Sequence, residues 1–157
     1  PYKEVFFFQK YLMFISYGFI HSNVIHLLIN VIALFLLGKI LRSLGKDNLT
    51  FLILFLSILG GATFYYLFKP NSPVPLIGAN CASFGLLAFV LSEELIKRLR
   101  RKRSVNQMVY VLLIFIFAHI LYFYAFSAIM PLSIIWQGHL GAFLVGAAIV
   151  LVSQKKV

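Results

Sequence analysis

The segment that decides the fold reads His21-Ser22-Asn23-Val24-Ile25-His26-Leu27-Leu28-Ile29-Asn30. It sets polar side chains into a chain that is otherwise strongly apolar. His26 and Asn30 are four residues apart, so they lie on one face of a helix. Polar groups are costly inside a lipid bilayer and usually mark a working site there. The segment therefore predicts a membrane helix that carries part of a reaction centre.

The composition indicates a membrane protein. Of the 157 residues, 62% are hydrophobic and 11% are charged, whereas soluble domains carry about 25% charged residues. There is no room for a second domain of this kind, so we expect a single membrane domain over 1–157. Cys81 is the only cysteine, which excludes a disulfide within the chain.

The net charge of +10 comes from a few places. Eleven of the 14 Lys and Arg residues fall in three clusters, Lys39/Arg42/Lys46, 97–103 and Lys155/Lys156. Each cluster follows an apolar run, which is typical of the cytoplasmic ends of membrane helices. The basic run 97–103 would also suit a nucleic-acid surface, but its position after a span argues against that reading, and we expect no nucleic-acid partner.

Five apolar segments approach the roughly 20 residues that a membrane span needs, at about 23–41, 50–68, 78–96, 108–127 and 137–153. If the first runs inward, the ends at 41, 96 and 153 lie together on the cytoplasmic side, where the basic clusters are. The fold class is therefore an all-α bundle of membrane helices.

Residues 2–20 mix charges with aromatic side chains, which is typical of a segment lying at the membrane interface. The alternative is a short sixth span over 5–20, and Lys10 in its middle argues against it.

Three of the predicted spans carry polar residues at their outer ends. His21 and His26 stand at the first, Asn80 at the third and His139 at the last. Because these ends lie at one depth, the side chains converge as a reaction site requires. His119 is alone on the fourth span, and we interpret it as packing.

This pattern resembles the rhomboid family of intramembrane serine proteases. The family motif H-x4-H-x3-N is matched by His21, His26 and Asn30. The motif around the last histidine is matched by Gly138-His139-Leu140-Gly141-Ala142-Phe143-Leu144-Val145-Gly146. The resemblance covers about residues 5–153 and implies a rhomboid-like bundle. The family's first span has no counterpart, and since the chain opens on Pro1, we expect that span to be missing from it.

The resemblance also implies roles for these residues. His139 corresponds to the general base, His26 and Asn30 to the groups that stabilise the oxyanion, and His21 to an organiser of the adjoining loop. No cofactor is implied. A zinc site made of His21, His26 and His139 is conceivable, but the chain has no HExxH pattern and the family chemistry needs no metal.

The departure from the family is the nucleophile. Where members read like G-A-S-G-A-V-F-G-L-L, this chain reads Gly78-Ala79-Asn80-Cys81-Ala82-Ser83-Phe84-Gly85-Leu86-Leu87. Asn80 stands at the serine position, and its carboxamide has no hydroxyl to give up. It could still hydrogen-bond His139, which would leave a site that is shaped but unable to form an acyl-enzyme.

Two other residues could replace the serine. Cys81 is a thiol next to position 80, but a helix turns by about 100° per residue, so its side chain should face away from His139 and pack as a small buried hydrophobe. Ser83 lies about 4.5 Å deeper on nearly the same face. Aligning it with the serine gives up the Gly85-Leu86-Leu87 match, and its other reading is a bond back to a backbone carbonyl.

Two functions therefore stand against each other. In the first, the protein engages transmembrane segments of other membrane proteins in the lipid bilayer without cutting them, as a natural pseudoprotease or as an engineered Ser-to-Asn form. In the second, it is an active intramembrane endopeptidase that uses Ser83 or Cys81 with His139. A transporter is disfavoured, because the pattern shows no broken helices in matched halves. We expect a multi-pass protein of the bacterial inner membrane.

Overall fold

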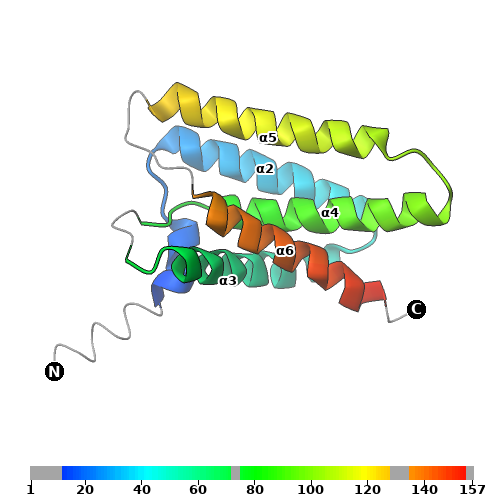
Figure 1. Ribbon diagram of the computed structural model, residues 1–157, viewed down its shortest axis with the longest axis horizontal. Helices are drawn as coiled ribbons and strands as arrows, with labels where there is room; N and C mark the ends of the chain where they lie inside the picture. The colour runs from blue at the N-terminus through cyan, green and yellow to red at the C-terminus, as the bar shows by residue number, and fades with distance from the viewer. Residues whose placement is uncertain (1–11, 72–74, 128–134, 155–157) are drawn as a thin grey trace.

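A computed structural model describes residues 12–71, 75–127 and 135–154. Within them the chain is an all-α bundle, as predicted, and contains no strand (Figure 1). The elements in chain order are η1 (Tyr17–Phe19), α2 (Val24–Ser43), η2 (Asp47–Leu49), α3 (Thr50–Phe68), α4 (Asn80–Arg100), α5 (Asn106–Ser127) and α6 (Trp136–Ser153). Residues 12–16 are also helical. Residues 2–11 of the predicted interfacial segment, and with them much of the alternative span 5–20, lie outside the described residues.

Each of the five predicted spans coincides with one long helix. Three segments of the described chain are long and apolar enough to cross a membrane, namely α2, Asp47–Phe68 and α6, with mean hydropathies of 2.4, 2.0 and 1.5. The last turns of α4 carry Lys97, Arg98 and Arg100, and α5 contributes a shorter apolar stretch over Asn106–Leu121. That α4 and α5 also cross the membrane stays a prediction.

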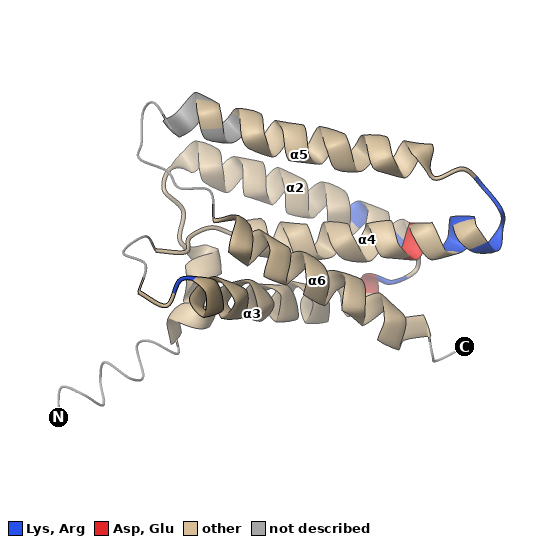
Figure 2. Ribbon diagram, viewed as in Figure 1, with Lys and Arg blue, Asp and Glu red and all other residues tan. Residues whose placement is uncertain are grey.

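The helices alternate in direction, so α2, α4 and α6 all end at the same end of the bundle (Figure 1). Most of the Lys and Arg residues in the described part of the chain lie at that end (Figure 2). Lys69 directly follows α3, which ends at the opposite end (Figure 1). Lys155 and Lys156, which form the third predicted cluster, lie outside the described residues.

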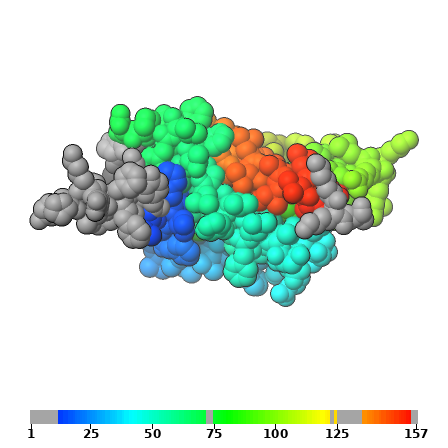
Figure 3. Space-filling model, turned by 90° about the horizontal axis from the view of Figure 1, so that it is seen from below, coloured from blue at the N-terminus to red at the C-terminus, as the bar shows by residue number. Residues whose placement is uncertain are grey.

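Helices α3, α4 and α6 pack closely because small residues line their contacts. A Cβ added at Gly146 would collide with the backbone of Gly85, and one added at Gly141 would lie 2.6 Å from the carbonyl oxygen of Gly60. Such residues let membrane helices approach until their backbones touch. Seen from the side opposite α5, α3 and α6 press together along the molecule (Figure 3).

The basic end of the bundle is held by a buried carboxylate. Glu93 of α4 is 1% exposed. Its Oε1 lies 3.6 Å from Lys46 Nζ, in the connection between α2 and α3, and it accepts a 3.0 Å hydrogen bond from Gln154 Nε2 after α6. A buried charge is tolerated where it is paired. Through these two contacts, Glu93 links α4 to the α2–α3 connection and to the residue after α6.

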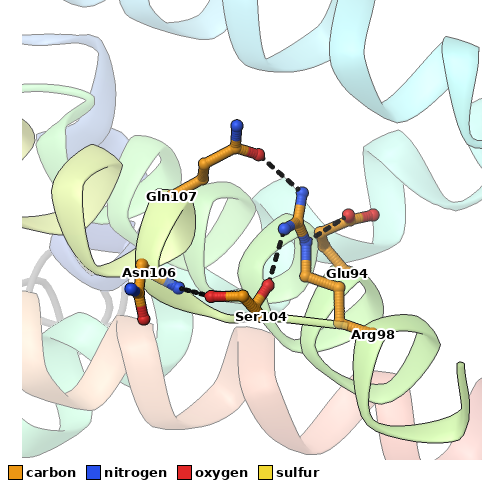
Figure 4. Close-up of polar contacts among 5 residues, drawn as sticks. All are labelled: Glu94, Arg98, Ser104, Asn106 and Gln107. Atoms are coloured by element: carbon orange, nitrogen blue, oxygen red, sulfur yellow. Dashed lines mark hydrogen bonds and ion pairs between the residues drawn. The ribbon is translucent and has the colours of Figure 1, made fainter. Parts of the chain in front are cut away.

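Helix α5 packs less closely, over its described residues, than the other long helices do. Its start is tied to α4 by Arg98, which donates to Glu94 Oε1 at 2.7 Å, the Ser104 carbonyl at 2.8 Å and Gln107 Oε1 at 3.1 Å (Figure 4). Farther along, Leu112 and Phe115 pack against the α2–α3–α4–α6 core. Helix α5 is therefore held by hydrogen bonds from Arg98 near its first residue, and by apolar side-chain packing farther along.

Candidate functional site

The first turn of α2 fixes His26. Asn23 precedes the helix and caps it, since its Oδ1 accepts the His26 backbone N–H at 2.8 Å. Asn30 donates to the His26 carbonyl at 3.0 Å one turn later. His26 Nδ1 lies 3.2 Å from Ser22 Oγ. His26 and Asn30 are both buried, so the two residues predicted to stabilise an oxyanion stand together on one rigid turn.

The loop before α4 passes directly over the His26 ring, and Gly78 makes this possible. Its φ is +94°, a conformation that favours glycine, and a Cβ there would lie 2.6 Å from His26 Cε1. The Gly78 N–H donates to the Tyr17 carbonyl at 3.0 Å. This close approach brings the beginning of α4, with Asn80, to the beginning of α2.

The same loop rests on His21, to which the resemblance gave an organising role. The Ala79 N–H donates to His21 Nε2 at 3.4 Å, and His21 Nδ1 lies 3.2 Å from the Phe19 carbonyl oxygen. A carbonyl only accepts, so the proton sits on Nδ1 and Nε2 is free to accept.

Tyr17 links this loop to α3. Its hydroxyl donates to the Ile58 carbonyl of α3 at 2.8 Å. Burial raises the pKa of Tyr17, so the phenol stays protonated and keeps donating.

Asn80 is turned toward His26. Its Nδ2 lies 3.2 Å from His26 Nε2. Because an amide nitrogen donates, Nε2 accepts, and His26 carries its proton on Nδ1, from which it donates to Ser22 Oγ. The sequence suggested a hydrogen bond from Asn80 to His139; the described part of the chain contains none, and the amide pairs with the other histidine instead.

His139 lies flat against Phe84, with ring centroids 4.3 Å apart and an interplanar angle of 7°. Phe84 is four residues after Asn80, so His139 packs on the face of α4 that carries position 80. His119 of α5 meets His139 edge-on, at 4.9 Å and 89°. His119 does pack, as interpreted from the sequence, and one of its partners is the histidine predicted to be the base. The one signal for Phe84 in the sequence is its helical spacing from position 80.

The two alternative nucleophiles occupy different places. Cys81 is 1% exposed and packs among the small residues of α3 and α6, so that a Cβ at Gly61 would lie 2.6 Å from its Sγ. Ser83 is buried, and its Oγ donates back to the Ala79 carbonyl at 3.4 Å. Neither side chain has a hydrogen bond to His139 among the described residues.

A cavity of about 440 Å³ opens beside these residues, between α2, α4 and α5. Polar side chains from all three helices line it: His26 and Asn30 of α2, Asn80 and Ser83 of α4, and His119 of α5. Its remaining walls are apolar side chains of the three helices, among them Ile29, Ile32, Ala33, Leu36, Leu37, Leu87, Val111, Ile114, Phe115 and Ala118. Apolar walls with a few convergent polar groups are typical of binding sites.

The zinc alternative gains no support from this geometry. In the residues that the structure describes, no three His, Cys, Asp or Glu side chains lie where they could hold one metal ion.

The sequence matches the Rhomboid domain family over residues 9–156. The chain belongs to the rhomboid family. The match confirms the family expected from the motifs and agrees with the all-α bundle of apolar helices, which makes this rhomboid an integral membrane protein. No curated protein matches the chain.

Proposed function

We propose that this rhomboid binds transmembrane segments of other membrane proteins and, with Asn80 at the nucleophile position, does not cleave them. Cleavage in this family type needs a hydroxyl oxygen that attacks the peptide carbonyl while a base takes its proton. The Asn80 carboxamide has no such proton, and its nitrogen lone pair is delocalised onto the carbonyl. No acyl-enzyme can therefore form at position 80.

The observation that carries the proposal is the pairing of Asn80 with His26. The amide donates to His26 Nε2 at 3.2 Å, so residue 80 is committed to the oxyanion side of the site. A serine at this position would be shorter and would lack this amide contact. We infer that the site is intact apart from the attacking group.

The other roles follow from where the side chains lie. His139, held on Phe84, is the general base. In a chain with serine at position 80, His26, with its ring proton moved to Nε2, and Asn30 would stabilise the oxyanion. One such donor accounts for about 100- to 1,000-fold in rate in serine proteases. His21 positions the Ala79 amide through its 3.4 Å contact and so acts on the loop rather than on the reacting atoms.

The active alternative, with Ser83 or Cys81 as nucleophile, has weaker geometric support. Ser83 Oγ is engaged with the Ala79 carbonyl at 3.4 Å, and the Cys81 thiol packs against Gly61 and Gly138. To attack, either side chain would have to leave its contact and reach His139 from a buried position.

The cavity supports a transmembrane segment as the partner. It lies between the membrane helix α2 and the apolar stretch of α5, and its walls are mostly aliphatic. A helix that enters from the lipid loses no hydrogen bonds and gains close packing. We place the protein in the bacterial inner membrane, with the ends at 41, 96 and 153 cytoplasmic, because the basic residues gather at that end (Figure 2).

The experiment is cleavage of a transmembrane substrate in liposomes by three proteins: the unmutated chain, Asn80→Ser, and Asn80→Ser with His139→Ala. We expect cleavage by the single variant alone. Cleavage by the unmutated chain would overturn the proposal, and Cys81→Ala and Ser83→Ala would then identify the attacking residue. Crosslinking of the same substrate to the unmutated chain tests binding separately.

A further inference from the structure

His119 lies at the meeting point of the base and the cavity. Its ring is 4.9 Å from the His139 ring at 89° and 4.9 Å from the Phe84 ring at 83°. Phe115, one turn earlier on α5, is nearly parallel to it at 6.0 Å. His119 therefore meets, edge-on, both members of the stacked pair that contains the base.

The His139 ring is therefore in contact with Phe84 on one face and with His119 in a perpendicular arrangement. The Phe84 face fixes the plane of the imidazole, and the His119 ring limits sliding across that face. Edge-to-face and stacked aromatic contacts of this kind are specific in geometry as well as attractive. Because Phe84 lies one helical turn beyond Asn80, the position of the His139 ring on Phe84 also sets its approach to residue 80.

His119 is also part of the cavity wall, with Val111, Ile114 and Ala118 of the same helix. A segment bound in the cavity would thus contact the helix whose side chain holds the base. The rest of α5 is tied down mainly at its far end, by Arg98. Among the described residues, His119 is the one that combines an aromatic ring contact to His139 with a place in the cavity wall.

We propose that His119 is a positioning residue for His139: its flat ring holds the imidazole in register on Phe84 and links the α5 wall of the cavity to the base. The inference rests on the proposed function, because it concerns the same site. It does not make His119 a proton carrier, so another flat ring of similar size should replace it.

The first test needs no catalysis. The background is the chain that keeps Asn80. In it, NMR measures the ring order parameter of isotope-labelled His139 for four single variants: His119→Ala, His119→Leu, His119→Phe and the control Phe117→Ala. Phe117 is on the same helix but 67% exposed. We expect a more mobile His139 ring with Ala and Leu and an unchanged ring with Phe and in the control. An unchanged order parameter in the Ala and Leu variants would overturn the inference.

The second test uses the Asn80→Ser background. We expect His119→Ala to lower kcat about two- to tenfold, with a smaller change in KM because its ring also lines the cavity, and His119→Phe to restore kcat. A parallel loss of folded protein, or an equal loss with Phe, would contradict a positioning role through ring shape. If Asn80→Ser never cleaves, the proposed function fails, while the NMR test still decides the role of His119.

Discussion

The two sides of this bundle are built on different principles. On one side, α3, α4 and α6 meet through glycines so closely that a single added methyl group would strike backbone atoms. On the other, α2, α4 and α5 enclose a cavity of about 440 Å³. The first side is packed to backbone contact, and the second leaves an apolar cavity.

The site lies on the seam between these sides. Position 80 and His139 come from the close-packed helices α4 and α6, whereas His26, Asn30 and His119 come from α2 and α5. The geometry between Asn80 and His139 is therefore set by the close-packed helices, and the cavity lies on the other side of the site. Under the proposed function, the close packing would hold the reacting geometry in advance, and the cavity would admit the transmembrane segment.

The largest effect is expected on the close-packed side. Gly146→Ala should lower the free energy of unfolding in detergent by about 3 kcal/mol or more. The added Cβ would meet the Gly85 backbone, and neither helix backbone can shift without disturbing its other contacts. The matched control is Gly38→Ala on α2, where a Cβ meets nothing within 4 Å. It should be neutral or stabilising by up to about 1 kcal/mol. Equal effects of the two changes would contradict the contrast between the sides.

The second prediction compares the unfolding free energies of two variants at neighbouring carboxylates, the buried Glu93 and the more exposed Glu94. Glu93→Ala should cost about 1–3 kcal/mol in unfolding free energy, because Gln154 and Lys46 lose a buried acceptor. Glu94→Ala should cost less than about 1 kcal/mol, since its partner Arg98 stays near solvent. Denaturant titrations of both variants measure the difference. A larger loss at Glu94 would show that burial does not govern this end of the bundle.

On the open side, filling the cavity should affect binding rather than folding. We expect Ala118→Trp to weaken the binding of a transmembrane peptide about tenfold, measured by energy transfer in liposomes, with unfolding unchanged. Phe117→Trp, on the exposed face of the same helix, is the control and should bind normally. Undiminished binding by Ala118→Trp would mean that the peptide binds elsewhere.

The smallest effect concerns the anchor of α5. Arg98→Ala removes the bonds to the Ser104 carbonyl and Gln107, and should speed amide exchange in the first turns of α5 about fivefold. Exchange in α3 and α6 should not change. Arg100→Ala, an exposed neighbour, serves as the comparison. Faster exchange throughout the bundle would instead show that α5 is not a separate unit.

The sequence carries much of the fold and part of the site. Helix positions follow from apolar runs of span length and from the Gly and Pro residues between them, which are local features. The glycines at 85 and 146 could be assigned to packing because small residues have few other roles in membrane helices. The cap at Asn23 is also a local signal.

The rest depends on contacts between helices, which local patterns do not contain. Asn80 could pair with either His26 or His139, and only the path of the Gly78 loop over His26 decides between them. His119 looked isolated because its partners, Phe84 and His139, lie on two other helices. Spacing gives the face of a residue, but not the neighbour that this face meets.

The most direct test of the central claim is covalent labelling by a fluorophosphonate, read as a mass adduct on the intact protein in detergent. An activated serine beside a histidine base reacts with such a reagent whether or not a substrate binds. We predict an adduct on Asn80→Ser, none on the unmutated chain, and none when His139→Ala is added. An adduct on the unmutated chain, or none on a folded Asn80→Ser variant, would contradict a site that lacks only its nucleophile.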